Sequence, residues 1–323
     1  MSAADSDKHH YLYGPVPSRR LGRSLGVDIV PYKVCSYDCI YCQLGRTTKL
    51  TSTPERFVSA EDVVRDIEQW LEQNGTADYI TFAGSGEPTL NSELGEMIRA
   101  TKGLTDIPLA VITNGSLLND PKIREAVLMA DVILPSLDAG TEYTFRIINR
   151  PAPGVRFEQV IEGLMRTSVE FSGPIWLEVM LVEGVNDSDD EIYAIREIVR
   201  HIWPDKLQIN TVERPSRSGN ASRVSKERLI EVCEIMGEDA EIIASNTAES
   251  VADGQQWQQM ESELIRMLSV RPCTVGDIVA ASGFNILEVT KCLQKLEQKG
   301  IVERVGDIDH YYRYVKGVQQ DDR

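Results

Sequence analysis

Residues 25–42 read LGVDIVPYKVCSYDCIYC, a short β-rich run that leads directly into a loop with three cysteines. The cysteines are Cys35, Cys39 and Cys42, and their spacing is C-x3-C-x2-C. Three thiolates on one short loop can hold three irons of a cubane cluster and leave the fourth iron free to bind and reduce another molecule. The pattern therefore predicts a reactive iron–sulfur centre just after a strand.

Two simpler interpretations of the three cysteines remain open. Free cysteines often act only as small core hydrophobes, and structural zinc uses four ligands, usually in two close pairs. The intervening Ser36 and Asp38 do not suit a core strand, and the nearest histidines are His9 and His10. Spacing and loop context together favour a cluster.

The pattern C-x3-C-x-aromatic-C, with Tyr41 at the aromatic position, resembles the signature of the radical S-adenosylmethionine (SAM) enzymes. The resemblance extends over roughly residues 11–220. It implies that a 4Fe–4S cluster binds the amino and carboxylate groups of SAM and cleaves its sulfonium with one electron. The resulting 5′-deoxyadenosyl radical would abstract hydrogen from an unidentified substrate, and a reductant such as flavodoxin or ferredoxin would supply the electron.

Short β-rich runs alternate with amphipathic helical patterns through most of the chain. The predicted strands are Leu25–Val30, Tyr79–Ala83, Leu109–Thr113, Val132–Leu137, Ile175–Leu181 and Leu207–Val212. Such alternation implies a parallel sheet with helical crossovers, and the number of strands falls short of a closed eight-stranded barrel. We therefore predict an α/β fold, a partial (β/α)6 barrel of the TIM type, which is also the usual fold of the resembled family.

Polar and glycine-rich segments follow the predicted strands, where barrels of this kind collect their active groups. The segment Gly84-Ser85-Gly86-Glu87-Pro88 resembles the family's GGE-type motif, with serine in place of one glycine. By that resemblance, the residues predicted to bind SAM are Tyr41, Gly84, Gly86, Glu87, Asn114, Ser136 and Asp138. Turn and strand-end capping chemistry is the alternative role for these residue types, and no residue is assigned to the chemical step itself.

Residues 13–26, YGPVPSRRLGRSLG, form an unusual segment before the first predicted strand. It resembles a branch of the superfamily that is labelled iron–sulfur oxidoreductases and is related to the wyosine-forming tRNA enzymes. Arg19 and Arg20 either bind an anion or brace the open side of the barrel. The wyosine enzymes carry further cluster cysteines upstream of the main loop, and no cysteine precedes Cys35 in this chain. The wyosine reaction, or another RNA modification, therefore stays only an alternative.

The C-terminal part has its own pattern, which resembles a winged helix. Its predicted helices and strands are Met260–Leu268, Thr274–Ala281, Asn285–Gly300, Ile301–Val305 and Tyr311–Val315. The predicted divisions of the whole chain are an N-terminal extension (1–24), a radical SAM barrel (25–245), a linker (246–254), a winged helix-turn-helix domain (255–316) and a disordered tail (317–323). A redox-sensing DNA-binding regulator is the alternative from another class, although Glu288 and Glu297 on the third helix disfavour phosphate contacts.

Composition limits the remaining choices. The chain has 323 residues, a net charge of −16 and six cysteines, so it is an ordinary globular protein and not a disulfide scaffold. No apolar run suits a membrane span and no signal peptide is evident, so we expect a cytoplasmic protein. The acidic balance argues mildly against a general polyanion binder, but the region around the cysteine loop is basic. RNA, a peptide or protein, and a small molecule all stay open as substrates.

Overall fold

The computed structural model describes residues 11–212, 221–243, 254–270, 272–282, 284, 286–305 and 311–315. The chain divides into two compact units. One is Pro15–Ala248, and the other combines Met1–Gly14 with Glu249–Arg323. The predicted tail 317–323 and nearly all of the predicted linker 246–254 lie outside the described residues; Gly254 already begins a helix.

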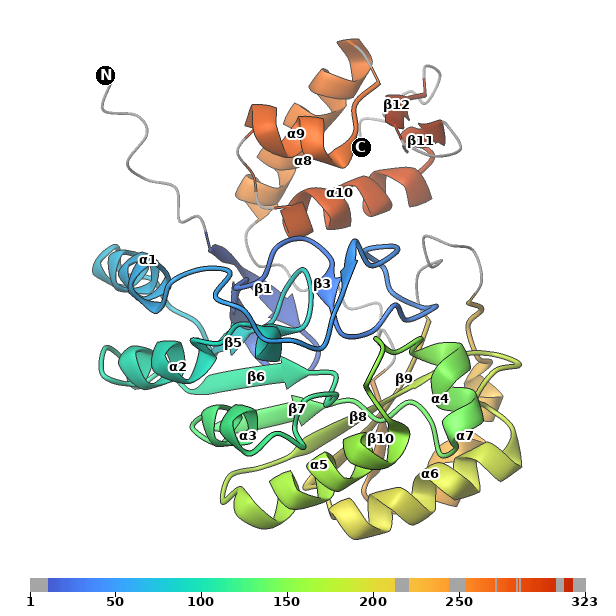
Figure 1. Cartoon of the computed structure of the whole chain (residues 1–323). Helices are drawn as coiled ribbons and strands as arrows, with labels where there is room; N and C mark the ends of the chain where they lie inside the picture. Colours follow the sequence, from blue (N-terminus) through green and yellow to red (C-terminus); the bar gives the residue numbers. More distant parts are fainter. Residues whose placement is uncertain are drawn as a thin grey trace. The chain divides into compact units, whose positions relative to one another are not determined.

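The larger unit is built on a curved row of strands (Figure 1). These are β1 Leu12–Ser18, β2 Gly22–Val27, β5 Tyr79–Phe82, β6 Leu109–Thr113, β7 Val132–Pro135, β8 Trp176–Leu181, β9 Lys206–Thr211 and β10 Ala240–Ile242. The strands are ordered β1-β2-β5-β6-β7 in one sheet and β10-β9-β8 in another. Bridges from Ile133 to Ile175 and from Ser136 to Glu178 connect β7 with β8. The strands from β2 to β10 pair in parallel within both sheets, so they form one curved, open row.

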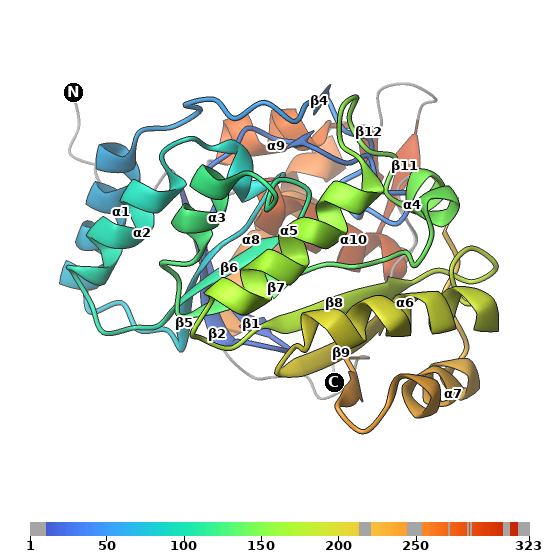
Figure 2. The same cartoon turned by 60° about the horizontal axis from the view of Figure 1, so that its bottom comes forward.

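Helices follow the strands along the chain, and most of them cover the outer side of this row. They are α1 Ala60–Glu72, the short η1 Pro88–Leu90, α2 Leu94–Lys102, α3 Pro121–Val127, α4 Glu142–Ile148, α5 Phe157–Glu170, α6 Asp189–Ile202 and α7 Lys226–Met236. Serine N-caps begin several of them: Ser59, Ser188 and Ser225 each accept a hydrogen bond from a backbone N–H of the first turn. Figure 2 shows α5 and α6 side by side on this outer layer. A helical layer over a parallel sheet buries the outward-facing side chains of the strands.

The two faces of β8 show how the row separates an outer core from an interior. Leu177, Val179 and Leu181 are fully buried, whereas Trp176, Glu178 and Met180 alternate with them and are partly accessible. Successive strand residues point to opposite faces. Trp176 packs with a buried cluster formed by Leu21, Ala110, Val132 and Leu134. Glu178 therefore shares the interior face with Trp176.

The predicted fold class is confirmed, with one difference at its N-terminal edge. Residues of the predicted N-terminal extension supply β1 and the first half of β2, because the chain forms strands on both sides of a turn at residues 19–21. Because Pro15 and Pro17 interrupt the segment, its sequence does not predict a strand, although proline is tolerated in an edge strand. At the turn, Arg19 Nη1 donates to the Ile243 carbonyl (2.5 Å) and Arg20 Nη1 donates to Glu178 (2.9 Å). These contacts agree with the bracing role and span the open side of the barrel.

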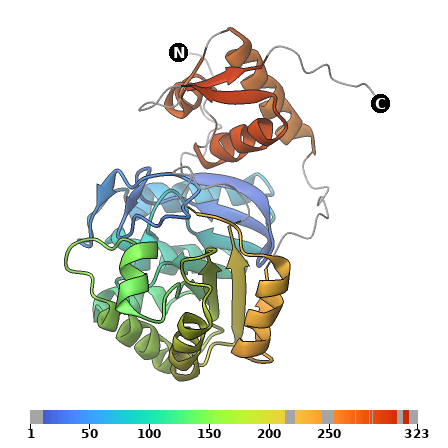
Figure 3. The ribbon, with the colours of Figure 1, turned by 90° about the vertical axis from the view of Figure 1, so that its right-hand side faces the viewer.

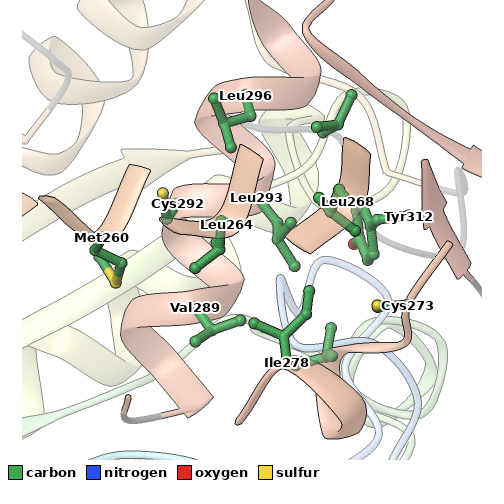
Figure 4. Close-up of a cluster of buried hydrophobic side chains, with 12 residues drawn as sticks. Met260, Leu264, Leu268, Cys273, Ile278, Val289, Cys292, Leu293, Leu296 and Tyr312 are labelled. Atoms are coloured by element: carbon green, nitrogen blue, oxygen red, sulfur yellow. The ribbon is translucent and has the colours of Figure 1, made fainter. Parts of the chain in front are cut away.

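The smaller unit has a separate core. Its elements are α8 Gly254–Val270, α9 Val275–Ser282, α10 Ile286–Gln298, β11 Val302–Val305 and β12 Tyr311–Tyr314, and the two strands pair antiparallel. Figure 4 shows Leu264, Leu293 and Tyr312 packed at its centre, with Cys273 and Cys292 among the buried residues. Three helices followed by two strands is the predicted order of elements. The winged-helix assignment itself stays a prediction.

Candidate active site

The three-cysteine loop lies at the carboxyl ends of the parallel strands. Cys35 closes the short strand β3 (Val34–Cys35), which pairs with β4 (Lys49–Leu50). The loop is fastened to the segment after α4, because Asp38 N donates to the Asn149 carbonyl (3.0 Å) and Ile40 N donates to the Ile148 carbonyl (2.9 Å). All three thiols are half-buried. Figure 3 views the larger unit from the side, with the N-terminal segment in blue lying across one end of the strands.

Each cysteine sulfur receives a nitrogen donor from another side chain. Asn114 Nδ2 lies 3.6 Å from Cys35 Sγ, and Asn149 Nδ2 lies 3.5 Å from Cys39 Sγ. Lys33 Nζ lies 3.0 Å from Cys42 Sγ. These are normal distances for weak hydrogen bonds to sulfur. The loop therefore presents three sulfurs that are each polarised by a neighbour.

Burial sets the ionisation of these groups. It raises the pKa of the Cys35 thiol to about 11, and nearby Glu87 adds to the rise; burial also raises the pKa of Cys39 well above its usual value. Burial lowers the pKa of Lys33, but the hydrogen bond to Cys42 and the electrostatic attraction of the three cysteine sulfurs outweigh it, so the net shift is upward. A positively charged Lys33 therefore accompanies the cysteine loop at neutral pH.

Glu87 joins the ends of two neighbouring strands. Its Oε1 accepts from Thr89 N (3.1 Å), Thr89 Oγ1 (2.6 Å) and Thr113 Oγ1 (2.6 Å), and its Oε2 accepts from Asn114 N (2.7 Å). Glu87 is 2% exposed, and burial raises the pKa of its carboxylate despite these four donors. The observed hydrogen bonds of Glu87 all come from the protein itself, so its role in binding SAM stays a prediction.

The glycines of the Gly84–Glu87 turn are required by the protein's own packing. A Cβ at Gly86 would lie 1.9 Å from the Val34 carbonyl oxygen, and a Cβ at Gly84 would lie 2.4 Å from the Asp28 carboxylate. Ser85, at the middle position, donates through Oγ to Asp28 Oδ2 (2.5 Å) and through its backbone N to Asp28 Oδ1 (3.0 Å). The serine is thus tied to the end of β2, which accounts for the departure from the GGE pattern.

Tyr41 and Asp138 form a second network. Tyr41 Oη donates to Asp138 Oδ2 (2.5 Å), and Asn149 Nδ2 donates to the same oxygen (2.7 Å). Met180 N donates to Asp138 Oδ1 (3.1 Å). Burial raises the pKa of Asp138 to about 6, against the lowering effect of these donors. The aromatic residue of the cysteine motif therefore holds a strand-end carboxylate.

The structure brings the predicted site residues to one edge of the sheet. Asn114 bonds Ser36 Oγ (2.8 Å) as well as Cys35, and the half-buried Ser136 bonds the Thr113 carbonyl through its backbone N (3.1 Å). Sequence reasoning missed Asn149, whose position 110 residues from Cys39 gives no local signal. It placed Lys33 only in a basic region, without a contact. Binding of SAM by the predicted residues stays a prediction.

The sulfurs of Cys35, Cys39 and Cys42 are the type of ligand that holds an iron–sulfur cluster. Within the described part of the chain, no three histidine, cysteine, aspartate or glutamate side chains are grouped to hold one metal ion. Zinc needs its ligands to converge on one centre, whereas thiolates of an iron–sulfur cluster bind different irons. The Tyr37 hydroxyl in the cysteine loop is buried without a partner among the described residues. Three thiols with separate donors fit a cubane with one open corner.

Comparisons with known proteins agree with this geometry. A family model described as the Radical SAM superfamily matches residues 29–194. The chain is 32% identical to the UPF0026 protein MJ1312 of Methanocaldococcus jannaschii over 80% of this chain and 82% of that protein. It is 37% identical to a Brachyspira hyodysenteriae protein named GTPase Obg, over 90% of this chain but only 43% of that protein. A solved structure of TYW1 with a lysine–pyruvate adduct shares the fold, with a TM-score of 0.52, 17% identity, and coverage of 68% of this chain and 74% of that one.

Proposed function

The chain belongs to the Radical SAM superfamily, and on that premise we propose that it reductively cleaves SAM at a cluster held by Cys35, Cys39 and Cys42, to abstract hydrogen from a substrate. The protein is an enzyme whose cofactors are a 4Fe–4S cluster and SAM. The observation that carries the proposal is the loop of three half-buried thiols, each with its own donor, at the carboxyl edge of a parallel barrel.

The protein's own residues position and shield this chemistry. When bound, the cluster supplies one electron to the sulfonium of SAM. The backbone bonds from Asp38 and Ile40 fix the cysteine loop, and Glu87 holds the Asn114 strand end beside Cys35. Fixed groups of this kind hold reactants in one geometry and exclude water.

Anaerobic reconstitution tests the proposal. We expect the wild-type protein to bind the iron and sulfide of one cubane, and to form 5′-deoxyadenosine from SAM with a strong reductant. Cys39→Ser should lose both, whereas Cys233→Ser, which alters a half-buried thiol on α7, should retain both. A wild-type protein without a cluster signal, or a full signal in Cys39→Ser, contradicts the proposal.

We propose that the substrate reaches the barrel interior along β8 and β9. Polar side chains line this side: Asn210 Nδ2 donates to Glu178 Oε1 (2.8 Å), and Gln208 Nε2 donates to Glu241 (3.0 Å). Gln208 Oε1 is buried with no partner among the described residues, which leaves an acceptor for a ligand donor. A small polar molecule or a peptide group suits this lining. In affinity measurements across a salt series, RNA binding that falls steeply with salt would instead favour a nucleic acid.

We propose that a small acidic electron carrier, such as flavodoxin or ferredoxin, reduces the cluster. The proposal is supported by Arg46, whose side chain is 88% exposed and lies 3.9 Å from the carboxylate of Asp38 in the cysteine loop. Attraction between opposite charges raises the rate at which two proteins associate. Arg46→Glu should slow flavodoxin-driven reduction at low salt while leaving chemical reduction unchanged; equal rates with flavodoxin would contradict the proposal.

A further inference from the structure

Three side chains from outside the span of the cysteines point nitrogen donors at the three sulfurs, one donor for each. We propose that Lys33, Asn114 and Asn149 form a donor shell that stabilises the reduced cluster, with the ammonium of Lys33 as its strongest member. The inference rests on the proposed function, because the shell acts on the cluster which that function requires. Here "donor shell" means these three residues.

The surroundings of Lys33 show that its position is built into the fold. The residue is 3% exposed and adopts a left-handed backbone with φ of 58°. Its N–H donates to the Ser85 carbonyl (2.8 Å), and its carbonyl accepts from Thr48 N (3.0 Å). Non-glycine residues rarely take this conformation. The fold therefore fixes the backbone at Lys33, and its amine lies at Cys42.

A buried lysine also needs negative charge nearby. Lysine is almost never fully buried unless it is paired, and an isolated buried charge is strongly unfavourable. Its Nζ donates to the sulfur of Cys42 at 3.0 Å. The site is thus arranged for anionic sulfur, as in a thiolate that ligates iron.

The donors differ in strength. Lys33 is charged and lies at 3.0 Å, whereas the amides of Asn114 and Asn149 are neutral and lie at 3.6 Å and 3.5 Å. Charge-assisted hydrogen bonds are about twice as strong as neutral ones. Hydrogen bonds to the sulfurs and net charge are among the factors that set a cluster's reduction potential. Because reduction adds negative charge, a nearby ammonium favours the reduced state most.

Potentiometric titration of the reconstituted cluster tests the inference. We expect Lys33→Met to shift the midpoint potential negative by at least about 59 mV, a tenfold lower ratio of reduced to oxidised cluster at a fixed potential. Lys33→Arg keeps a charged donor and should shift less. Lys49→Met is the matched control: it removes the same charge from β4, next to β3, but from a side chain that is 46% exposed and paired with Glu55. Equal shifts in Lys33→Met and Lys49→Met would overturn the inference.

A spectroscopic measurement tests the inference even if the Lys33→Met variant fails to assemble its cluster. Pulsed electron paramagnetic resonance of reduced wild-type protein, grown with isotope-labelled lysine, should show a lysine nitrogen coupled to the cluster. The coupling should vanish in Lys33→Arg prepared with the same label. A wild-type cluster without lysine coupling refutes the donor role while leaving SAM cleavage intact; a wild-type protein without any cluster removes the proposed function and the inference together.

Discussion

Glu87 is the residue at which a cofactor role and a structural role are most easily separated. Its carboxylate accepts four hydrogen bonds while fully buried. Glu87→Gln replaces one acceptor oxygen with an N–H donor group that faces existing donors. We expect the cofactor-free protein to lose about 1–3 kcal/mol of unfolding free energy, measured by urea denaturation.

The control for this substitution is Glu125→Gln, which changes an exposed carboxylate on α3 and should leave stability within about 0.5 kcal/mol of wild type. If Glu87→Gln unfolds like wild type without cofactor and differs only in SAM affinity, the carboxylate serves the cofactor and not the strand ends.

Asp138 gives a pH dependence whose sign follows from burial. Its pKa is raised to about 6 in the folded protein, against an ordinary value of 3.8. Between these values the folded state binds the proton and the unfolded state does not, so stability is greatest below about pH 4 for this group and falls as pH rises to 6. The loss amounts to about 3 kcal/mol. Urea titrations of cluster-free protein from pH 4 to 7 should show this slope, and Asp138→Asn should flatten it; an unchanged slope in the variant refutes the assignment.

At the level of single residues, the sequence identifies functional residues that lie close together in the chain and misses those that only folding brings together. Cys35, Cys39 and Cys42 were recognisable because their thiols share one loop. Asn149 was not, since only the return of the chain after α4 brings its amide to Cys39. For Lys33 the sequence indicates only a positive charge near the loop, because its burial and backbone conformation depend on the fold.

At the level of elements, the end of α6 carries an unusual cap. Trp203 adopts a left-handed conformation with φ of 53° and is 85% exposed. Glycine usually occupies this position, and tryptophan gains little burial here. Trp203→Gly should therefore raise the free energy of unfolding by about 0.5–1 kcal/mol. The substitution relieves the backbone strain, and the greater entropy of the unfolded chain with glycine offsets part of this gain.

Asn74→Gly supplies the comparison, because Asn74 has a similar φ of 60° near the end of α1 and asparagine tolerates this region better. Its gain should be smaller. A Trp203→Gly protein that is less stable than wild type in urea denaturation would show that the indole makes a stabilising contact.

Element prediction succeeded where one periodicity dominates. The β-branched run Leu109–Thr113 is predicted as a strand and forms β6 with the same bounds, because nearly all of it is buried. β1 was assigned to an extension, since prolines and glycine interrupt its alternation. β2 ends at Val27 and not at Val30, and Asp28 beyond it receives two hydrogen bonds from Ser85.

At the scale of the whole molecule, charge is distributed in a way that bears on partners. The described arginines of β11 and β12 are paired within the smaller unit: Arg304 with Glu297 (2.7 Å) and Arg313 with Glu303. Paired arginines are poorly available for phosphates. This pattern weakens the DNA-binding regulator as an alternative, although nothing in it assigns a partner to the smaller unit.

The two separate cores predict two cooperative units of unfolding. The core around Leu264, Leu293 and Tyr312 draws its members from the smaller unit only, whereas the cysteine loop belongs to Pro15–Ala248. A ligand stabilises the unit that binds it by RT ln(1 + [L]/Kd), about 2.7 kcal/mol at a concentration of 100 Kd. SAM added to the reconstituted protein should therefore slow hydrogen exchange in peptides from residues 25–212 and leave those from 260–305 unchanged.

Leu293→Ala should speed hydrogen exchange only in peptides of the smaller unit, since a core cavity costs about 2–5 kcal/mol of stability. Protection by SAM that spreads equally to both sets of peptides would show that the cores unfold as one, and would give the smaller unit a direct energetic connection to the cofactor site.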